Sequence, residues 1–111
     1  MHPWLMAPLI LPESLSLIAA PMINQSDLPF RLLTRKHGAT TAYTQMLFPD
    51  RLINDQEYFQ FHRRDLEHSA HSDLGRPVIV QLCGNDADEI VRAARLVEGL
   101  CDGIGALHLF T

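Results

Sequence analysis

Hydrophobic and polar positions follow two patterns along this chain. Short apolar runs at 16–20, 40–47 and 77–82 are typical of strands, and the last run is continuous enough for burial on both faces. The segments 27–37 and 86–99 carry apolar side chains at three- and four-residue spacing, which predicts amphipathic helices. A fourth strand is expected to begin near Gly103. Because the strands alternate with helices, the pattern favours an α/β fold with parallel strands.

Turn and capping residues set the expected ends of the helices. Ser26 or Asp27 can cap the first helix, and Pro29 suits its first turn, where a missing N–H costs nothing. Asp86 with Glu89 forms an acidic variant of the capping box at the start of the second helix. These signals agree with the boundaries that the apolar spacing indicates.

The segment 48–75 has the weakest pattern. It predicts a short helix near 51–54 and otherwise mostly loop, because it is rich in His, Asp, Arg and Glu. The loose cluster of His62, His68 and His71 is interpreted as a solvated surface segment rather than a metal site. A loop of this length in a compact domain is often functional.

Composition narrows the class of protein. The 111 residues are 47% apolar and 20% charged, which is typical of one small globular domain. The formal net charge is −4, whereas a stand-alone nucleic-acid binder usually has an excess of basic residues. Cys83 and Cys101 show neither CxxC nor zinc spacing, so two buried thiols in a reducing compartment are expected.

The apolar start of the chain does not have the pattern of a membrane segment. It lacks a basic region, and Pro3, Pro8 and Pro12 interrupt it, so neither a signal peptide nor a spanning helix is predicted. An intracellular protein, cytoplasmic or nuclear, without membrane or metal partners is expected.

The ends of the predicted strands hold the candidate chemistry, because ligands of parallel α/β folds bind at the carboxyl ends of the strands. Pro21 and Met22 offer a fixed backbone and a polarizable side chain, which suit a planar ring, although these residues taken alone favour a packed core. Gln45 and Gln81 are neutral amides in apolar strands. Each amide either binds a ligand, such as a flavin or pyrimidine edge, or satisfies backbone groups. The sequence leaves both alternatives open.

Two long blocks resemble a known family. IAAPMINQSDLPFRLLTRKHGATTAYTQM and RPVIVQLCGNDADEIVRAARLVEGLCDGI are similar to the opening of tRNA-dihydrouridine synthases, especially the eukaryotic type that modifies the D-loop. The resemblance implies an N-terminal TIM (β/α)8 barrel that binds FMN. It also implies reduction of the C5–C6 bond of uridine in tRNA, with NADPH as the reductant.

The resemblance assigns roles to particular residues. Pro21, Met22 and Ile23 match the first flavin-contacting segment, and Gln81 matches the glutamine that hydrogen-bonds the flavin ring. Cys83 lies in the QLCGN block and is not the family's proton-donating cysteine, which is expected beyond the end of this chain.

The chain departs from the family after Ile104. The family continues with Asp-Leu-Asn and then Gly-Cys-Pro, whereas residues 105–111 read GALHLFT. We therefore expect an N-terminal extension over 1–15 and, over 16–111, a truncated barrel of three to four βα units that is inactive alone. The alternatives are a non-catalytic α/β fragment and a small binding protein.

Overall fold

A computed structural model describes residues 12–108 of the chain. Most of the proline-interrupted start falls outside these residues. The strands are β1 (Ile18–Ala19), β2 (Thr41–Leu47), β3 (Val78–Gly84) and β4 (Gly103–His108). The helices are α1 (Leu28–Lys36), α2 (Pro49–Asn54), α3 (Gln56–Ala70) and α4 (Ala87–Val97), with 3₁₀ turns η2 (Pro12–Leu15) and η3 (Glu98–Leu100).

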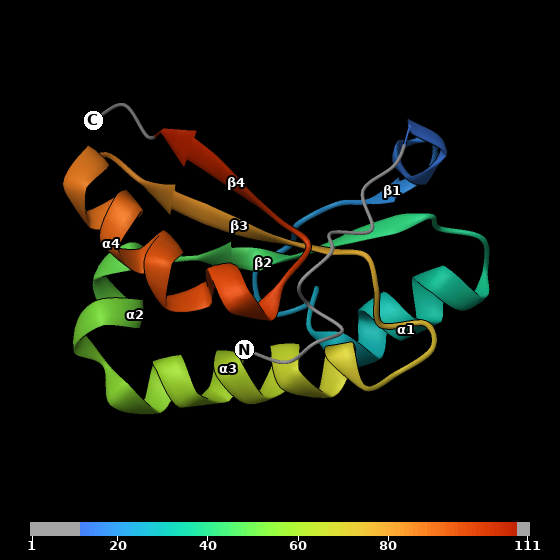
Figure 1. Ribbon diagram of the computed structural model, residues 1–111, viewed down its shortest axis with the longest axis horizontal. Helices are drawn as coiled ribbons and strands as arrows, with labels where there is room; N and C mark the ends of the chain where they lie inside the picture. Colours follow the sequence, from blue (N-terminus) through green and yellow to red (C-terminus); the bar gives the residue numbers. More distant parts are fainter. Residues whose placement is uncertain (1–11, 109–111) are drawn as a thin grey trace.

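The four strands form one sheet in the order β1-β2-β3-β4, and all three pairings are parallel. Ala42 of β2 pairs with Val78 of β3, and Ile79 of β3 pairs with Gly103 of β4. The α-helices lie on one side of this sheet (Figure 1). Consecutive parallel strands joined through helices confirm the predicted α/β fold and match the first units of a TIM barrel.

The hydrophobic core lies between the sheet and the helices. Val80 and Leu82 of β3 are fully buried there. They pack with Leu52 of α2, Leu66 of α3 and Val97 of α4. Because side chains alternate along a strand, the residues between them face the other way. We call that opposite surface the far face. It carries Tyr43, Met46, Ile79, Gln81 and Cys83.

The segment after β2 differs from the prediction. Its short helix is confirmed as α2, but most of the predicted loop is the 15-residue helix α3. The side chain of Asp55 caps α3 by accepting a hydrogen bond from the backbone N–H of Tyr58 at 3.1 Å. Buried residues at 62, 66 and 69 then recur at three- and four-residue spacing, so a narrow buried stripe holds an otherwise polar helix against the core.

The three histidines of this segment differ in their exposure to solvent. His68 and His71 are exposed, as predicted. His62 is only 4% exposed, so the prediction of a solvated side chain is wrong for this residue. It lies on the buried stripe of α3, with its ring edge-on to the rings of Tyr58 and Phe61 at centroid distances of 4.6 and 4.9 Å.

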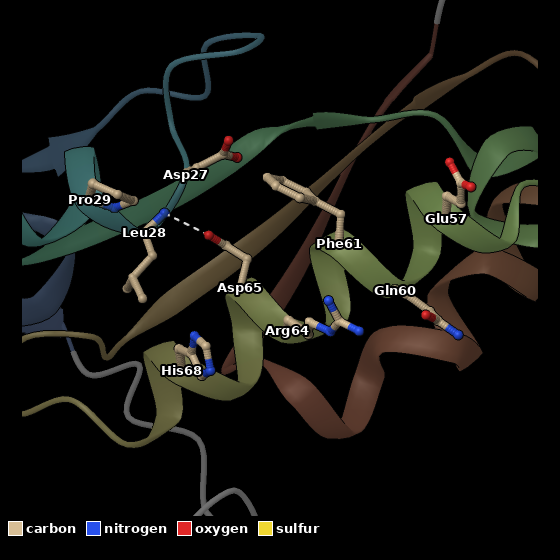
Figure 2. Close-up of a pocket in the computed structure, with 9 residues that line it drawn as sticks. All are labelled: Asp27, Leu28, Pro29, Glu57, Gln60, Phe61, Arg64, Asp65 and His68. Atoms are coloured by element: carbon tan, nitrogen blue, oxygen red, sulfur yellow. Dashed lines mark hydrogen bonds between the residues drawn. The ribbon is translucent and has the colours of Figure 1, made fainter.

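Helix α1 begins at a cap that comes from another helix. Asp27 stands at the N-cap position but makes no capping hydrogen bond with its side chain. The Asp65 carboxylate of α3 instead accepts from the backbone N–H of Leu28 at 2.8 Å (Figure 2). At α4 the predicted cap is confirmed, because Asp86 accepts from the backbone N–H groups of Asp88 and Glu89. The reciprocal bond from the Asp86 N–H to the Glu89 side chain, which would complete the predicted capping box, is not formed within residues 12–108.

Both cysteines are buried free thiols, as predicted. Burial raises the pKa of Cys101 to about 11, so this thiol stays protonated and unreactive at neutral pH. Within residues 12–108, every helix is too short or too polar to cross a bilayer.

Candidate functional site

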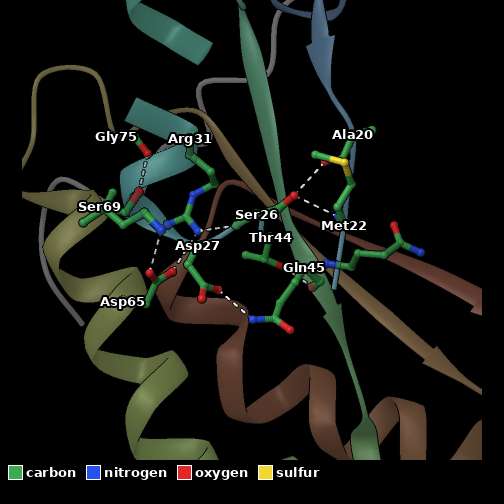
Figure 3. Close-up of polar contacts among 12 residues, drawn as sticks. Ala20, Met22, Ser26, Asp27, Arg31, Thr44, Gln45, Asp65, Ser69 and Gly75 are labelled. Carbon is green, nitrogen blue, oxygen red and sulfur yellow. Dashed lines mark hydrogen bonds and ion pairs between the residues drawn. The ribbon is translucent and has the colours of Figure 1, made fainter. Parts of the chain in front are cut away.

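The loop between β1 and α1 has a fixed backbone at the carboxyl edge of the sheet. The Ser26 hydroxyl donates to the carbonyl of Ala20 at 2.9 Å and accepts from the N–H of Met22 at 2.8 Å (Figure 3). The N–H of Ser26 closes the turn onto the carbonyl of Met22 at 3.0 Å. Ser26 is 1% exposed. Pro21 and Met22 are therefore held half-buried, whereas Ile23 is 43% exposed at the edge.

Gln45 joins this loop to β2. Its Oε1 accepts from the N–H of Asn24 at 3.1 Å, and its Nε2 donates to Asp27 Oδ1 at 2.8 Å. The register of the β2–β3 pair shifts between Tyr43 and Met46, which turns Gln45 away from the far face and toward the loop. Both polar atoms of Gln45 are bonded within the protein, so the structural alternative holds for this residue.

An ion pair beneath the loop completes its support. Arg31 of α1 is 1% exposed, and its Nη1 lies 3.0 Å from the Ser26 carbonyl and 2.8 Å from Asp65 Oδ2. Its Nε and Nη2 atoms are buried without a hydrogen-bond partner in the part of the chain that the structure describes. Sequence reasoning missed this pair, because Asp65 was assigned to a loop and nothing in the sequence pairs the two positions.

Gln81 of β3 has a different environment. Its Nε2 reaches only the carbonyl of Leu82, at a long 3.4 Å, and no donor within residues 12–108 bonds its Oε1. Gly105 of β4 is its register partner, and a Cβ there would lie 2.9 Å from Oε1. The half-buried amide thus keeps a donor and an acceptor available on the far face.

The structure places the four predicted cofactor residues on strands that are not neighbours. Pro21, Met22 and Ile23 follow β1, and β2 runs between β1 and β3. Gln81 is the middle residue of β3, because this strand continues to Gly84 beyond the end that the sequence predicted. Across residues 12–108, no hydrogen bond links Gln81 to the 21–23 segment. A ligand that contacted both would have to span the end of β2.

Two hollows lie beside the loop. The larger, of about 580 Å³, lies between the start of α1 and helix α3, and none of the predicted site residues line it (Figure 2). A smaller one of about 310 Å³ lies at the ends of β1 and β2 and includes Ile23 and Gln45 in its wall. No group of three or more His, Cys, Asp or Glu side chains among residues 12–108 is arranged to hold a metal ion.

Comparison with known proteins identifies relatives over most of the chain. The model of the family described as dihydrouridine synthase (Dus) matches residues 17–106. The tRNA-dihydrouridine(16/17) synthase [NAD(P)(+)] of Saccharomyces cerevisiae is 40% identical over 87 residues, which are 78% of this chain and 20% of that protein. The "-like" protein of that name from Rattus norvegicus is also 40% identical, over 78% of this chain and 18% of its own length.

A third relative, the tRNA-dihydrouridine(16/17) synthase [NAD(P)(+)] of Schizosaccharomyces pombe, is 37% identical over 78% of this chain and 21% of its own length. The chain thus spans about a fifth of the length of the curated relatives it matches.

Proposed function

The chain belongs to the dihydrouridine synthase family, and on that premise we propose that it serves in the reduction of uridine in tRNA. The reaction saturates the C5–C6 bond of the uracil ring, with NADPH as the source of the hydride. Three relatives carry tRNA-dihydrouridine synthase and NAD(P)(+) in their names, which supports both the substrate and the reductant.

We propose FMN as the bound cofactor, and the state of the Gln81 amide is the observation that carries this proposal. A buried or half-buried amide normally has its polar atoms bonded within the protein. Gln81 has one long bond and a free acceptor on the far face. A flavin ring edge presents alternating N–H and carbonyl groups, which this amide can pair with.

The loop after β1 supplies the second part of the proposed site. Ser26 fixes the backbone of Pro21 and Met22, so a planar ring would meet a rigid surface rather than an adaptable loop. Met22 offers a polarizable thioether, and the 43% exposed Ile23 offers apolar surface. When bound, FMN would supply hydride transfer between NADPH and the uracil ring. The residues of this chain would bind and orient the flavin.

The chain alone provides too little of this site for tight binding. A TIM barrel closes with eight strands, and the sheet described for this chain has four. The 111-residue chain purified by itself should neither retain FMN through gel filtration nor form dihydrouridine in tRNA. A flavin absorbance spectrum that elutes with the chain would contradict this expectation.

A chimaera tests the proposed function directly. Residues 17–104 of this chain would replace the matching segment of the Saccharomyces cerevisiae relative. The chimaera should bind FMN and reduce uridine in tRNA, whereas a chimaera that folds but neither binds FMN nor forms dihydrouridine would refute the proposal. The unmodified relative serves as the positive control.

A further inference from the structure

The smaller hollow beside the β1–α1 loop has the features of a second binding site. We call it the rim pocket; Asp27, Phe48, Arg51, Tyr58, Phe61 and His62 contribute to its wall. Its volume of about 310 Å³ lies at the lower end of the range of small-molecule sites. Of the residues proposed to contact the flavin, Ile23 also lines the rim pocket, whereas Pro21, Met22 and Gln81 are not in its wall; the rim pocket is therefore a hollow beside the proposed flavin site.

His62 supplies a buried polar group that points into the rim pocket. The residue is 4% exposed, and within residues 12–108 no hydrogen bond engages either ring nitrogen. Neither ring nitrogen is among the fully buried atoms that lack a hydrogen-bond partner, so both keep some accessible surface. Because His62 lines the rim pocket, these unbonded nitrogens border it. Burial lowers the pKa of the His62 imidazole, so at neutral pH the ring offers one donor and one acceptor. A polar ligand would satisfy a group that proteins rarely leave unbonded.

The wall of the rim pocket contains aromatic side chains, a positively charged side chain and a negatively charged one. The Arg51 guanidinium lies over the Tyr58 ring, 4.1 Å from its centroid, and its side chain is 53% exposed. Its Nη2 already lies 3.4 Å from Asp55 Oδ2 in an exposed ion pair, which leaves its other N–H groups for a second anion. Asp27 uses Oδ1 for Gln45, and no hydrogen bond within residues 12–108 occupies its Oδ2. Phe61 projects from α3 toward Asp27 with a ring that is 54% exposed (Figure 2).

We propose that the rim pocket binds a single nucleotide, with the base against Phe61, base-edge hydrogen bonds to His62 and Asp27, and the phosphate at Arg51. A nucleobase has a flat surface and an edge of N–H and carbonyl groups. The Phe61 ring suits the flat surface, and the neutral His62 imidazole and the Asp27 carboxylate suit the edge. Arg51 is the one cation among the described residues of the wall, which suits one phosphate.

The nucleotide could belong to an RNA strand or to a free dinucleotide reductant, and the position of the pocket favours RNA. The rim pocket lies at the carboxyl edge of the sheet, where the proposed function brings a tRNA uridine to the flavin. This assignment to RNA rests on the proposed function, whereas nucleotide binding rests on the pocket alone. A base near the reacting uridine would then be held outside the catalytic centre and would position the strand.

Nuclear magnetic resonance titration of the full 111-residue chain tests the site without flavin. Uridine 5′-monophosphate and uridine are the first probes, followed by a uridylate tetranucleotide and NADPH. The variants are Phe61→Leu and Arg51→Gln, both at exposed side chains, and His62→Phe, which keeps an aromatic ring. Arg64→Gln is the matched control, because Arg64 is exposed on α3 and lines only the larger hollow.

Uridine 5′-monophosphate should shift the ring signals of Phe61 and His62 in a saturable way. Phe61→Leu and His62→Phe should each weaken binding roughly fivefold or more. Arg51→Gln should weaken binding of the nucleotide but not of uridine, and Arg64→Gln should change neither. The tetranucleotide should bind more tightly than NADPH.

Three results would overturn the proposal. Absence of saturable shifts at Phe61 and His62 up to about 10 mM nucleotide would exclude a site of useful affinity. Loss of binding in Arg64→Gln, with binding by Arg51→Gln unchanged, would place the ligand in the larger hollow instead. Tighter binding of NADPH than of the tetranucleotide would reject the assignment to RNA. Because no flavin takes part, these failures are distinct from a chimaera that lacks FMN.

Discussion

The neighbouring strands β2 and β3 each carry a glutamine, and the two side chains differ in how the fold satisfies them. Gln45 is 6% exposed and uses its amide oxygen and nitrogen for Asn24 and Asp27. Gln81 is half-buried, and its side-chain amide makes one hydrogen bond, of 3.4 Å to the Leu82 carbonyl, within the described chain. A glutamine in an apolar strand is therefore not by itself a sign of a ligand; what distinguishes the two is whether the fold already satisfies the amide.

The difference extends to the surroundings of each glutamine. Around Gln45 the β1–α1 loop is tied by Ser26 and, beneath it, by the buried pair Arg31–Asp65. On the Gln81 side, Gly105 leaves space beside the amide. The surroundings of Gln45 are thus a rigid support, whereas the Gln81 amide has an oxygen that no donor within residues 12–108 bonds. Substitutions around Gln45 should change the stability of the fold, and substitutions at Gln81 should change the affinity for FMN.

The largest expected effect on the rigid side comes from Asp65→Ala. The change removes the counter-ion of Arg31, which is 1% exposed, and leaves the N–H of Leu28 without its cap. Breaking one partner of a buried ion pair typically costs about 3–5 kcal/mol. The free energy of unfolding, measured by urea titration, should fall by that order.

Glu67→Ala is the matched control on the same helix. It breaks an ion pair with Arg63 at 2.7 Å, but the Arg63 side chain is 57% exposed. Such surface pairs are worth about 0–1 kcal/mol. Equal losses of stability in the two variants would show that the Arg31–Asp65 pair does not support the loop as described.

A smaller loss is expected for Gln45→Leu. The variant keeps the approximate volume but leaves the N–H of Asn24 and Asp27 Oδ1 without their partner. An unsatisfied group of this kind costs about 1–3 kcal/mol. Gln60→Leu, at an exposed position of α3, should leave the urea midpoint nearly unchanged. If both variants melt like the unmodified chain, the two hydrogen bonds of Gln45 contribute nothing to the loop.

The smallest effect is a dependence of stability on pH from His62. Burial lowers the pKa of its imidazole below the usual 6.5, so the unfolded chain takes up a proton at a higher pH than the folded one. Stability from this group is complete above about pH 6.5 and is lost as the pH falls through the folded pKa. The urea midpoint should therefore drop between pH 7.5 and 5.5, and His62→Phe should reduce that drop. His68→Phe, at an exposed site, should leave it intact.

Strong local patterns made most of the fold predictable. The continuous apolar run at 77–82 corresponds to β3. Pro29 lies in the first turn of α1, and Asp86 caps α4, as the sequence indicated. Helix α3 was missed because its buried stripe is narrow and partly polar, with His62 and Ser69 beside Leu66. The spacing of Tyr58, His62 and Leu66 behind a capping Asp55 was the signal that could have revealed it.

The long-range polar contacts could not be predicted in the same way. The bond of Gln45 to Asp27 depends on a register shift in β2, and the pairing of Arg31 with Asp65 depends on a helix assigned to loop. Neither has a local pattern in the sequence. The place of Gln81 in a parallel strand was predictable, but its place at the strand end was wrong because β3 continues to Gly84. That its amide makes one long bond, to the Leu82 carbonyl, could be learned only from the coordinates.

A flavin titration beside a melting curve tests the central claim most directly, with Gln81→Leu and Gln45→Leu compared in the chimaera that carries residues 17–104. Gln81→Leu should raise the Kd for FMN roughly five- to 150-fold while the melting temperature without FMN stays unchanged. Gln45→Leu should lower the melting temperature. The account would be contradicted if Gln81→Leu lowered the melting temperature and the folded chimaera still bound FMN with undiminished affinity.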